Sequence, residues 1–172
     1  MAPRNVAAES FWRFSLMIYA RPGVAEALIR LQDRGGQDVN LILFGLWLGM
    51  CHGGRLDVAA LNRAKAAKAE LDRDVVEPLR RLRRGLKRNS DPDIEDLRWR
   101  VLALEIIAER RVQARLAAAV ARRRNARTAD RARLAEANLR LILGADFTSA
   151  EAAVLRRAIG GLWVPVLVET PR

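Results

Sequence analysis

The sequence predicts an all-α protein, a single-domain bundle of six to eight helices around an apolar central third helix. Ala, Leu and Arg favour helices and are abundant, whereas aromatic residues, which favour strands, make up only 5% of the chain. Apolar residues recur at spacings of three and four, and the alternation typical of strands is missing. With 172 residues, 51% of them hydrophobic, the chain is long enough to bury one core, and we expect one domain over residues 1–172.

Proline and glycine residues mark the boundaries of the first two helices. We expect the first helix over about residues 7–19, largely buried because apolar side chains occupy two adjacent faces. It ends before Pro22, since the residue that precedes a proline disfavours the helical conformation. Pro22 itself fits the first turn of a second helix, which Gly35 and Gly36 end.

The third helix is the expected centre of the core. Asp38 is its candidate N-cap, and the helix extends to about His52 with apolar side chains on almost every side. Trp47 lies in this stretch and is therefore expected to be buried. Gly45 and Gly49 are four residues apart, so a neighbouring helix can approach closely along that side.

The rest of the chain predicts helices over about residues 57–88, 91–124, 130–143 and 149–162, with a polar break at 125–128. Asp57 is the candidate N-cap of the first of these, and Pro78 is expected to break or kink it near Val76. The helix that starts near Pro92 has an expected inner stripe at spacings of three and four: Leu97, Val101, Leu104, Ala108, Val112, Leu116 and Val120. The apolar segment 163–168 is expected to fold back onto the body.

A net charge of +11 and a pI of about 11.4 indicate that the chain attracts acidic partners. The densest basic cluster contains Arg80, Arg81, Arg84, Lys87 and Arg88, and on a helix all but Arg81 lie along one side. A second cluster contains Arg123, Arg124 and Arg127, followed by Arg131 and Arg133. If the two clusters converge, they form a groove suited to phosphates. The alternative is a solvated face that reflects a GC-rich genome.

The cysteine and histidine content argues against catalytic and metal sites. Cys51 and His52 are the single residues of their types, and adjacent side chains on a helix point about 100° apart. We therefore expect no catalytic, metal-binding or cofactor-binding residues, and an inert buried thiol. The lone cysteine and the lack of a signal-peptide pattern favour a cytoplasmic protein. The longest apolar run, residues 41–51, is shorter than the ~20 residues of a membrane span.

Glu105 and Glu109 have two interpretations. They lie four residues apart on one helix face, so their carboxylates can meet at one place. Structural ion pairing, with Arg110, Arg111 and Arg140 as available partners, is favoured over a metal site, because the Glu-x-x-His pattern of two-metal bundles is missing.

The start of the third helix also has two interpretations. Asp38 and Asn40 indicate a candidate polar pocket, together with Tyr19 and Arg21. The favoured alternative is structural: Asp38 caps the helix, and Asn40 bonds to a neighbouring turn.

Several motifs indicate a family. They are FWxFSL (11–16), YxRPGV (19–24), LQD (31–33), DVNLxLFxLWLG (38–49) and VVEPLR (75–80). Together they resemble a proteobacterial family of small uncharacterised helical proteins, classed as a domain of unknown function. The resemblance covers about residues 9–120 and implies that the helices of residues 125–172 are variable. No activity is established for this family, so the resemblance implies a fold and a compartment but no mechanism.

Three functional hypotheses follow. The first is a non-enzymatic binding or adaptor module whose basic face takes RNA or an acidic protein surface. The second is a small helical enzyme or ligand-binding protein with a pocket near Asp38, Asn40 and Trp47. The third is peripheral membrane contact through the basic face. The composition favours the first, a binding protein without a cofactor.

Overall fold

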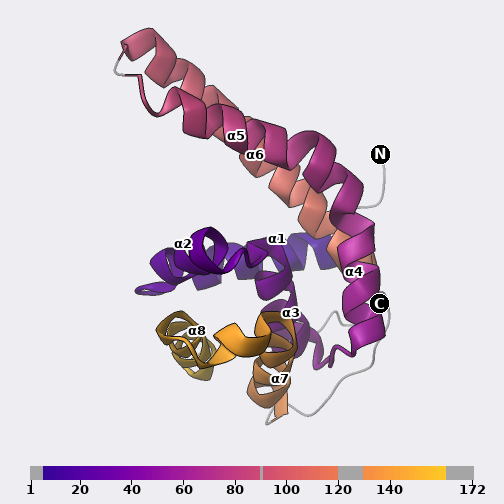
Figure 1. The fold of residues 1–172 in the computed structure, drawn as a ribbon. Coiled ribbons are helices and arrows are strands. Elements are labelled where there is room, and N and C mark those ends of the chain that lie inside the picture. Colours follow the sequence, from indigo (N-terminus) through magenta and orange to yellow (C-terminus); the bar gives the residue numbers. More distant parts are fainter. Residues whose placement is uncertain (1–5, 90, 120–129, 162–172) are drawn as a thin grey trace.

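The computed structural model describes residues 6–89, 91–119 and 130–161, and Figure 1 shows them as helices joined by turns. The α-helices are α1 (Val6–Tyr19), α2 (Val24–Gly35), α3 (Val39–His52), α4 (Val58–Leu71), α5 (Glu77–Leu86), α6 (Pro92–Ala119), α7 (Arg131–Leu143) and α8 (Ala150–Gly160). These ranges contain no strand, so the predicted all-α fold is confirmed. The predicted helix ends near residues 124 and 162 and the apolar segment 163–168 lie outside the described residues.

Helix α3 occupies the centre of the core. Eleven of its fourteen residues are buried, and it contacts α1, α2, α6 and α7. Helix α7 packs on the side where Gly45 and Gly49 lie. A Cβ atom at Gly45 would come within 2.5 Å of the Ile142 side chain, and one at Gly49 would overlap the backbone of Ala135. Only glycine therefore permits this close approach.

Polar side chains tie down the two ends of α3. Asp38 caps the first turn by accepting a hydrogen bond from the Leu41 N–H at 3.1 Å. At the other end, Arg131 of α7 donates to the carbonyl oxygens of Met50 and Cys51 at 3.3 and 3.4 Å. Arg131 is buried, so its place in the second basic surface cluster was predicted wrongly.

Helices α4 and α5 form one continuous helix through a π-helical turn, η1 (Asp72–Val76). The chain was predicted to break or kink near Val76; it does not break, and the regular α-helix is instead interrupted by this π-helical turn, which ends at Val76. The Glu77 N–H bonds to the Asp72 carbonyl, five residues back, and this wider turn accommodates a proline that cannot continue the usual ladder. Figure 1 shows α5 and the facing half of α6 projecting beyond the other helices; we call residues 77–104 the arm.

The inner face of α6 differs from the predicted stripe. Val101, Ala108, Val112 and Leu116 are buried as predicted, but Leu97 and Leu104 are 44% and 53% exposed, and Val120 lies outside the described residues. The buried position in that turn is Glu105. Along the arm, α6 packs mainly against α5, and α5 itself has no buried residue. Most of the surface of α6 in the arm is therefore exposed to solvent.

Helix α1 is also less buried than predicted. One face, with Phe11, Phe14, Ser15 and Ile18, is buried, and α1 contacts α6 and α3. Leu16, on the adjacent face, is 53% exposed. Within the described ranges, none of the helices combines the length and the apolar character that a membrane crossing requires.

We predict that Trp47→Ala lowers the free energy of unfolding by about 3–5 kcal/mol, because it removes a large buried ring. Trp47 is 2% exposed, stacks on Phe11 with ring centroids 5.0 Å apart, and donates to the Ser10 hydroxyl at 3.2 Å. Urea unfolding measures the loss. The matched control is Trp99→Ala on the arm, where the ring is 54% exposed and the loss should be small. Equal losses for the two variants would contradict this assignment of the core.

Candidate functional site

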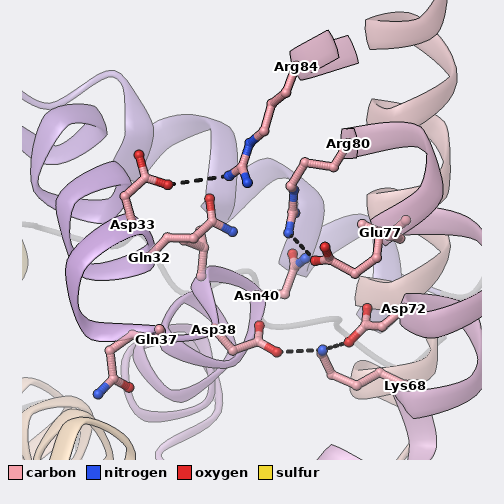
Figure 2. A pocket seen from close by; sticks show the side chains of 13 residues that line it. Gln32, Asp33, Gln37, Asp38, Asn40, Lys68, Asp72, Glu77, Arg80 and Arg84 are labelled. Atoms are coloured by element: carbon pink, nitrogen blue, oxygen red, sulfur yellow. Dashed lines mark hydrogen bonds and ion pairs between the residues drawn. The ribbon is translucent and has the colours of Figure 1, made fainter. Parts of the chain in front are cut away.

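A polar pocket of about 340 Å³ lies between the α2–α3 turn on one side and α4, η1 and α5 on the other (Figure 2). It is lined by Gln32, Asp33, Gly36, Gln37, Asp38, Val39, Asn40, Lys68, Asp72, Val76, Glu77, Arg80 and Arg84. Four of these side chains are carboxylates and three are cationic, so the lining has a net charge of −1 (3 − 4). The pocket is thus locally acidic on a chain whose net charge is +11.

Lys68 is the central residue of an ion-pair system in this pocket. Its side chain is only 5% exposed, and its ammonium group lies 2.5 Å from Asp38 Oδ2 and also pairs with Asp72 (Figure 2). Asp38 therefore caps α3 with one oxygen and binds Lys68 with the other. This shared carboxylate joins the start of α3 to α4.

Arg80 forms the wall of the pocket nearest to α6. Its guanidinium group is engaged by three carboxylates: Nη1 lies 2.7 Å from Glu77, Nη2 lies 2.9 Å from Glu109, and Nε lies 3.4 Å from Glu105. Arg83 Nε adds a 2.5 Å contact to Glu105. The predicted solvated position of Arg80 is therefore wrong, because α6 brings two carboxylates to the face of α5 on which Arg80 lies.

Glu105 and Glu109 do form ion pairs, but their predicted partners were wrong. Arg110 pairs instead with Glu9 of α1 at 2.6 Å, and Arg140 lies over the Phe147 ring at 4.1 Å. Arg111 is exposed. The partners come from α5 because α6 turns its glutamate face toward that helix and its arginine face away from it.

The environment of this cluster alters several pKa values. Burial raises the pKa of Glu109, although Arg80 opposes that effect. Burial would lower the pKa of Arg80, but the carboxylates of Glu109, Glu77 and Glu105 outweigh it and raise the pKa. Burial, aided by the Glu109 charge, raises the pKa of nearby Tyr19 to about 12. The arginine and the phenol therefore stay protonated throughout the neutral pH range.

Asn40 connects the pocket to the core. Its side chain is buried, and its Oδ1 accepts a hydrogen bond from Gln113 of α6 at 3.2 Å. Gln113 in turn accepts from the Ser15 hydroxyl of α1 at 3.3 Å. The partner of Asn40 is thus a distant helix rather than the neighbouring turn that we predicted. Its Nδ2 group has no hydrogen-bond partner among the described residues.

The other candidate pocket residues lie elsewhere. Tyr19 and Arg21 do not line the pocket. Tyr19 lies close enough to Glu109 and Arg80 for their charges to act on its pKa, whereas Arg21 donates to the Gly161 carbonyl at 3.2 Å. Trp47 is enclosed in the core. Lys68 and Asp72, by contrast, were missed. Lys68 continues the buried positions Leu61 and Ala64 on one face of α4, and a lysine in such a stripe is the signal that identifies it.

The basic cluster on α5 divides between the pocket and the surface. Arg84 faces the pocket and pairs with Asp33 at 3.3 Å, while Arg81, Lys87 and Arg88 are exposed. In the described part of the chain these last three form no ion pair. Arg123, Arg124 and Arg127 lie outside the described residues, so the convergence of two basic clusters stays a prediction.

A second recess, of about 680 Å³, adjoins the pocket. The two share Gly36, Gln37, Asp38, Lys68, Asp72 and Glu77, and the second adds Leu41, Lys65, Ala69, Arg73, Arg81 and Ile142. Its lining has three carboxylates and four cations, a net charge of +1 (4 − 3). Lys68, Asp38 and Asp72 therefore lie on the boundary that the two recesses share; we call these three ion-paired residues the ridge.

Neither recess contains Cys51 or His52. Burial raises the pKa of the Cys51 thiol to about 12, so the thiol stays protonated at neutral pH. The His52 ring packs against the edge of Trp47, with centroids 4.4 Å apart. Within the described ranges, no group of three or more His, Cys, Asp or Glu side chains is placed to hold a metal ion.

We predict that Lys68→Met lowers the free energy of unfolding by about 3 kcal/mol, because it leaves two carboxylates facing one another without a cation. Asp38 and Asp72 are 34% and 26% exposed, which places the loss at the lower end of the range for buried pairs. Urea unfolding measures it. Adding Asp72→Asn should recover part of the loss, and an unchanged stability in Lys68→Met would contradict the ion-pair assignment.

Comparisons with curated proteins and with solved structures gave no match. A family model, by contrast, matches residues 10–116, more than half of the chain. The matched stretch contains every residue that lines the pocket, from Gln32 to Arg84, and ends before α7 and α8. The chain therefore belongs to the family described as "Protein of unknown function (DUF2390)".

Proposed function

We propose that this chain is a non-enzymatic binding protein whose pocket at the base of the arm takes a small, charged, polar ligand. The observation that carries the proposal is the lining: seven charged side chains surround a recess of about 340 Å³, a volume in the range of ligand sites. Two of these side chains, Lys68 and Arg80, are only 5% and 12% exposed, and burying a charge costs free energy that an apolar residue would not cost.

The pairing of the charges favours binding over catalysis. Each of the four carboxylates has a cationic partner: Asp33 pairs with Arg84, Asp38 and Asp72 with Lys68, and Glu77 with Arg80. These pairs hold the side chains in fixed positions, which reduces the entropy lost when a ligand binds. The π-helical turn η1 supplies Asp72 and Val76 to the same wall, and such turns are frequent at functional sites.

We predict that one class of charged metabolite raises the melting temperature of the protein. The panel contains amines, amino acids, phosphate monoesters and dicarboxylates. At a concentration about 100 times Kd, binding stabilises the fold by about 2.7 kcal/mol, or about 5–10 °C for a chain of this size. The pocket variant Asp33→Asn should reduce the shift.

The control for that experiment is Asp96→Asn. Asp33 and Asp96 are both exposed aspartates paired with an arginine, but only Asp33 lines the pocket. The control should keep the full shift. A panel without any stabilising compound, or equal shifts for the two variants, would overturn the proposal.

A second candidate function is the binding of RNA or of an acidic protein by the outer face of the arm. The observation that favours it is that Arg81, Lys87 and Arg88 are exposed and unpaired among the described residues, so their charge is not neutralised internally. Arg80 and Arg84, by contrast, face the pocket and contribute little to that surface.

We predict that RNA binding, if it occurs at this face, falls steeply with salt. Each phosphate contact that Lys87→Glu/Arg88→Glu removes should reduce the slope of log affinity against log salt by roughly 0.7–0.9. Filter binding at two salt concentrations measures this slope. Arg30→Glu/Arg34→Glu, with the same charge change on exposed positions of α2, is the control. Equal slopes for the two variants would exclude the arm face as the RNA site.

A further inference from the structure

We propose that the ligand is dipolar, with a cationic group in the pocket and an anionic group in the adjoining recess, bridging the ridge formed by Lys68, Asp38 and Asp72. This inference rests on the proposed function and names the chemistry of its ligand. Two independent features carry it: two exposed carboxylates at the opening of the pocket, and two uncommitted cations in the adjoining recess.

The pocket side offers two exposed carboxylates to a ligand, beside Arg84, which pairs with one of them. Arg80 uses Nε, Nη1 and Nη2 on three carboxylates, so it has few donors left for a ligand. Asp33, which lines only the pocket, and Glu77, which lines both recesses, each make one ion pair among the described residues and are 54% and 50% exposed. Each carboxylate can accept about four hydrogen bonds. Figure 2 shows these two carboxylates on opposite sides of the opening. A guanidinium or ammonium group would donate hydrogen bonds to these carboxylates, whereas an anion would be repelled by their negative charge.

The adjoining recess is rich in donors. Lys65 and Arg81 line it, are exposed, and form no ion pair in the part of the chain that the structure describes. Arg73, also in the lining, is held by its neighbour Asp74 at 2.7 Å, so it is not counted as available. A carboxylate or phosphate placed here would gain two charge-assisted hydrogen bonds.

The ridge makes the two sides parts of one site. Lys68 is bound on both sides, to Asp38 and Asp72, and these three residues line both recesses. The three ridge residues together carry a net charge of −1 (1 − 2), and their closest polar contacts are to one another. Spare hydrogen-bonding capacity remains at Asp33 on the pocket side, at Glu77 on the boundary, and at Lys65 and Arg81 in the adjoining recess. A ligand that carries one charge uses half of the site, and a dipolar ligand uses both halves.

The test uses three matched probes in isothermal titration calorimetry: 4-guanidinobutyrate, which has both charges, butylguanidine, which lacks the carboxylate, and butyrate, which lacks the guanidinium group. We expect 4-guanidinobutyrate to bind about 10- to 100-fold more tightly than either probe with one charge, the effect of one lost charge-assisted contact. Lys65→Gln/Arg81→Gln should weaken 4-guanidinobutyrate to the affinity of butylguanidine and leave butylguanidine unchanged.

The complementary variant, Asp33→Asn/Glu77→Gln, should weaken both guanidinium probes. All four substituted side chains are exposed, so the fold should persist, and thermal melting checks this. Arg30→Gln/Arg34→Gln is the charge-matched control for the basic variant and should bind all three probes as the wild type does.

The outcomes separate the inference from the proposed function. Equal affinities for 4-guanidinobutyrate and butylguanidine, insensitive to Lys65→Gln/Arg81→Gln, would overturn the dipolar ligand and leave a cation-binding pocket. A second outcome is that none of the three probes binds, while another class of metabolite in the panel stabilises the protein and Asp33→Asn reduces that shift. In that case the dipolar inference fails and the proposed function stands. If nothing binds through the pocket, both fail.

Discussion

The close packing of α3 against α7 is the constraint on which the other helices depend. Because α3 is apolar on almost every side, it must be covered all round, and α1, α2, α6 and α7 do this. Gly45 and Gly49 allow α7 to approach so closely that Asn138, fully buried, donates to the Gly45 and Gly54 carbonyls at 3.0 Å. Once α3 is fixed in this way, its first turn has one possible position, and Asp38 and Asn40 face α4 and α6.

Ion pairs, beside the packing of half-buried Leu79 against the core, join the arm to the rest of the molecule. Helix α5 has no buried residue, and the ion pairs of Arg80 and Arg83 with Glu105 and Glu109 join it to α6. Buried ion pairs contribute little net stability, but their fixed geometry can specify one register where an apolar seam would slide. We interpret the cluster in this way. The consequence for the pocket is direct, because the same register sets the positions of Arg80 and Arg84 in its wall.

Local signals in the sequence identified the helices well, and nonlocal contacts account for the errors. Helices α2 and α3 end at the predicted Gly35 and His52, because caps and glycines act within one turn. The inward face of α6 was misassigned at Leu104, one residue from the buried Glu105. The prediction assumed that the apolar side of α6 faces inward. The arginines of α5 instead form ion pairs with the glutamate side of α6, so that side is the buried one. Only part of the pocket could be predicted, for the same reason. Asp38 and Asn40 lie at the start of a helix and give a local signal, but Lys68 of α4 and Asp72 of η1 join them through nonlocal packing.

The contrast between the whole chain and its pocket separates two kinds of recognition. The net charge of +11 creates a field that attracts anions and acts over about 8 Å at physiological salt, so it governs encounters with large acidic partners at the outer surface. The pocket lining has a net charge of −1, so under our proposal direct contacts with paired side chains, not the overall field, would select the ligand. Arg81 lines the recess beside the pocket and also belongs to the exposed basic cluster. A small ligand there would neutralise one of the three charges available to RNA, so the two proposed activities would compete at this residue. Lys87 and Arg88 do not line the recesses and would keep their charge in either state.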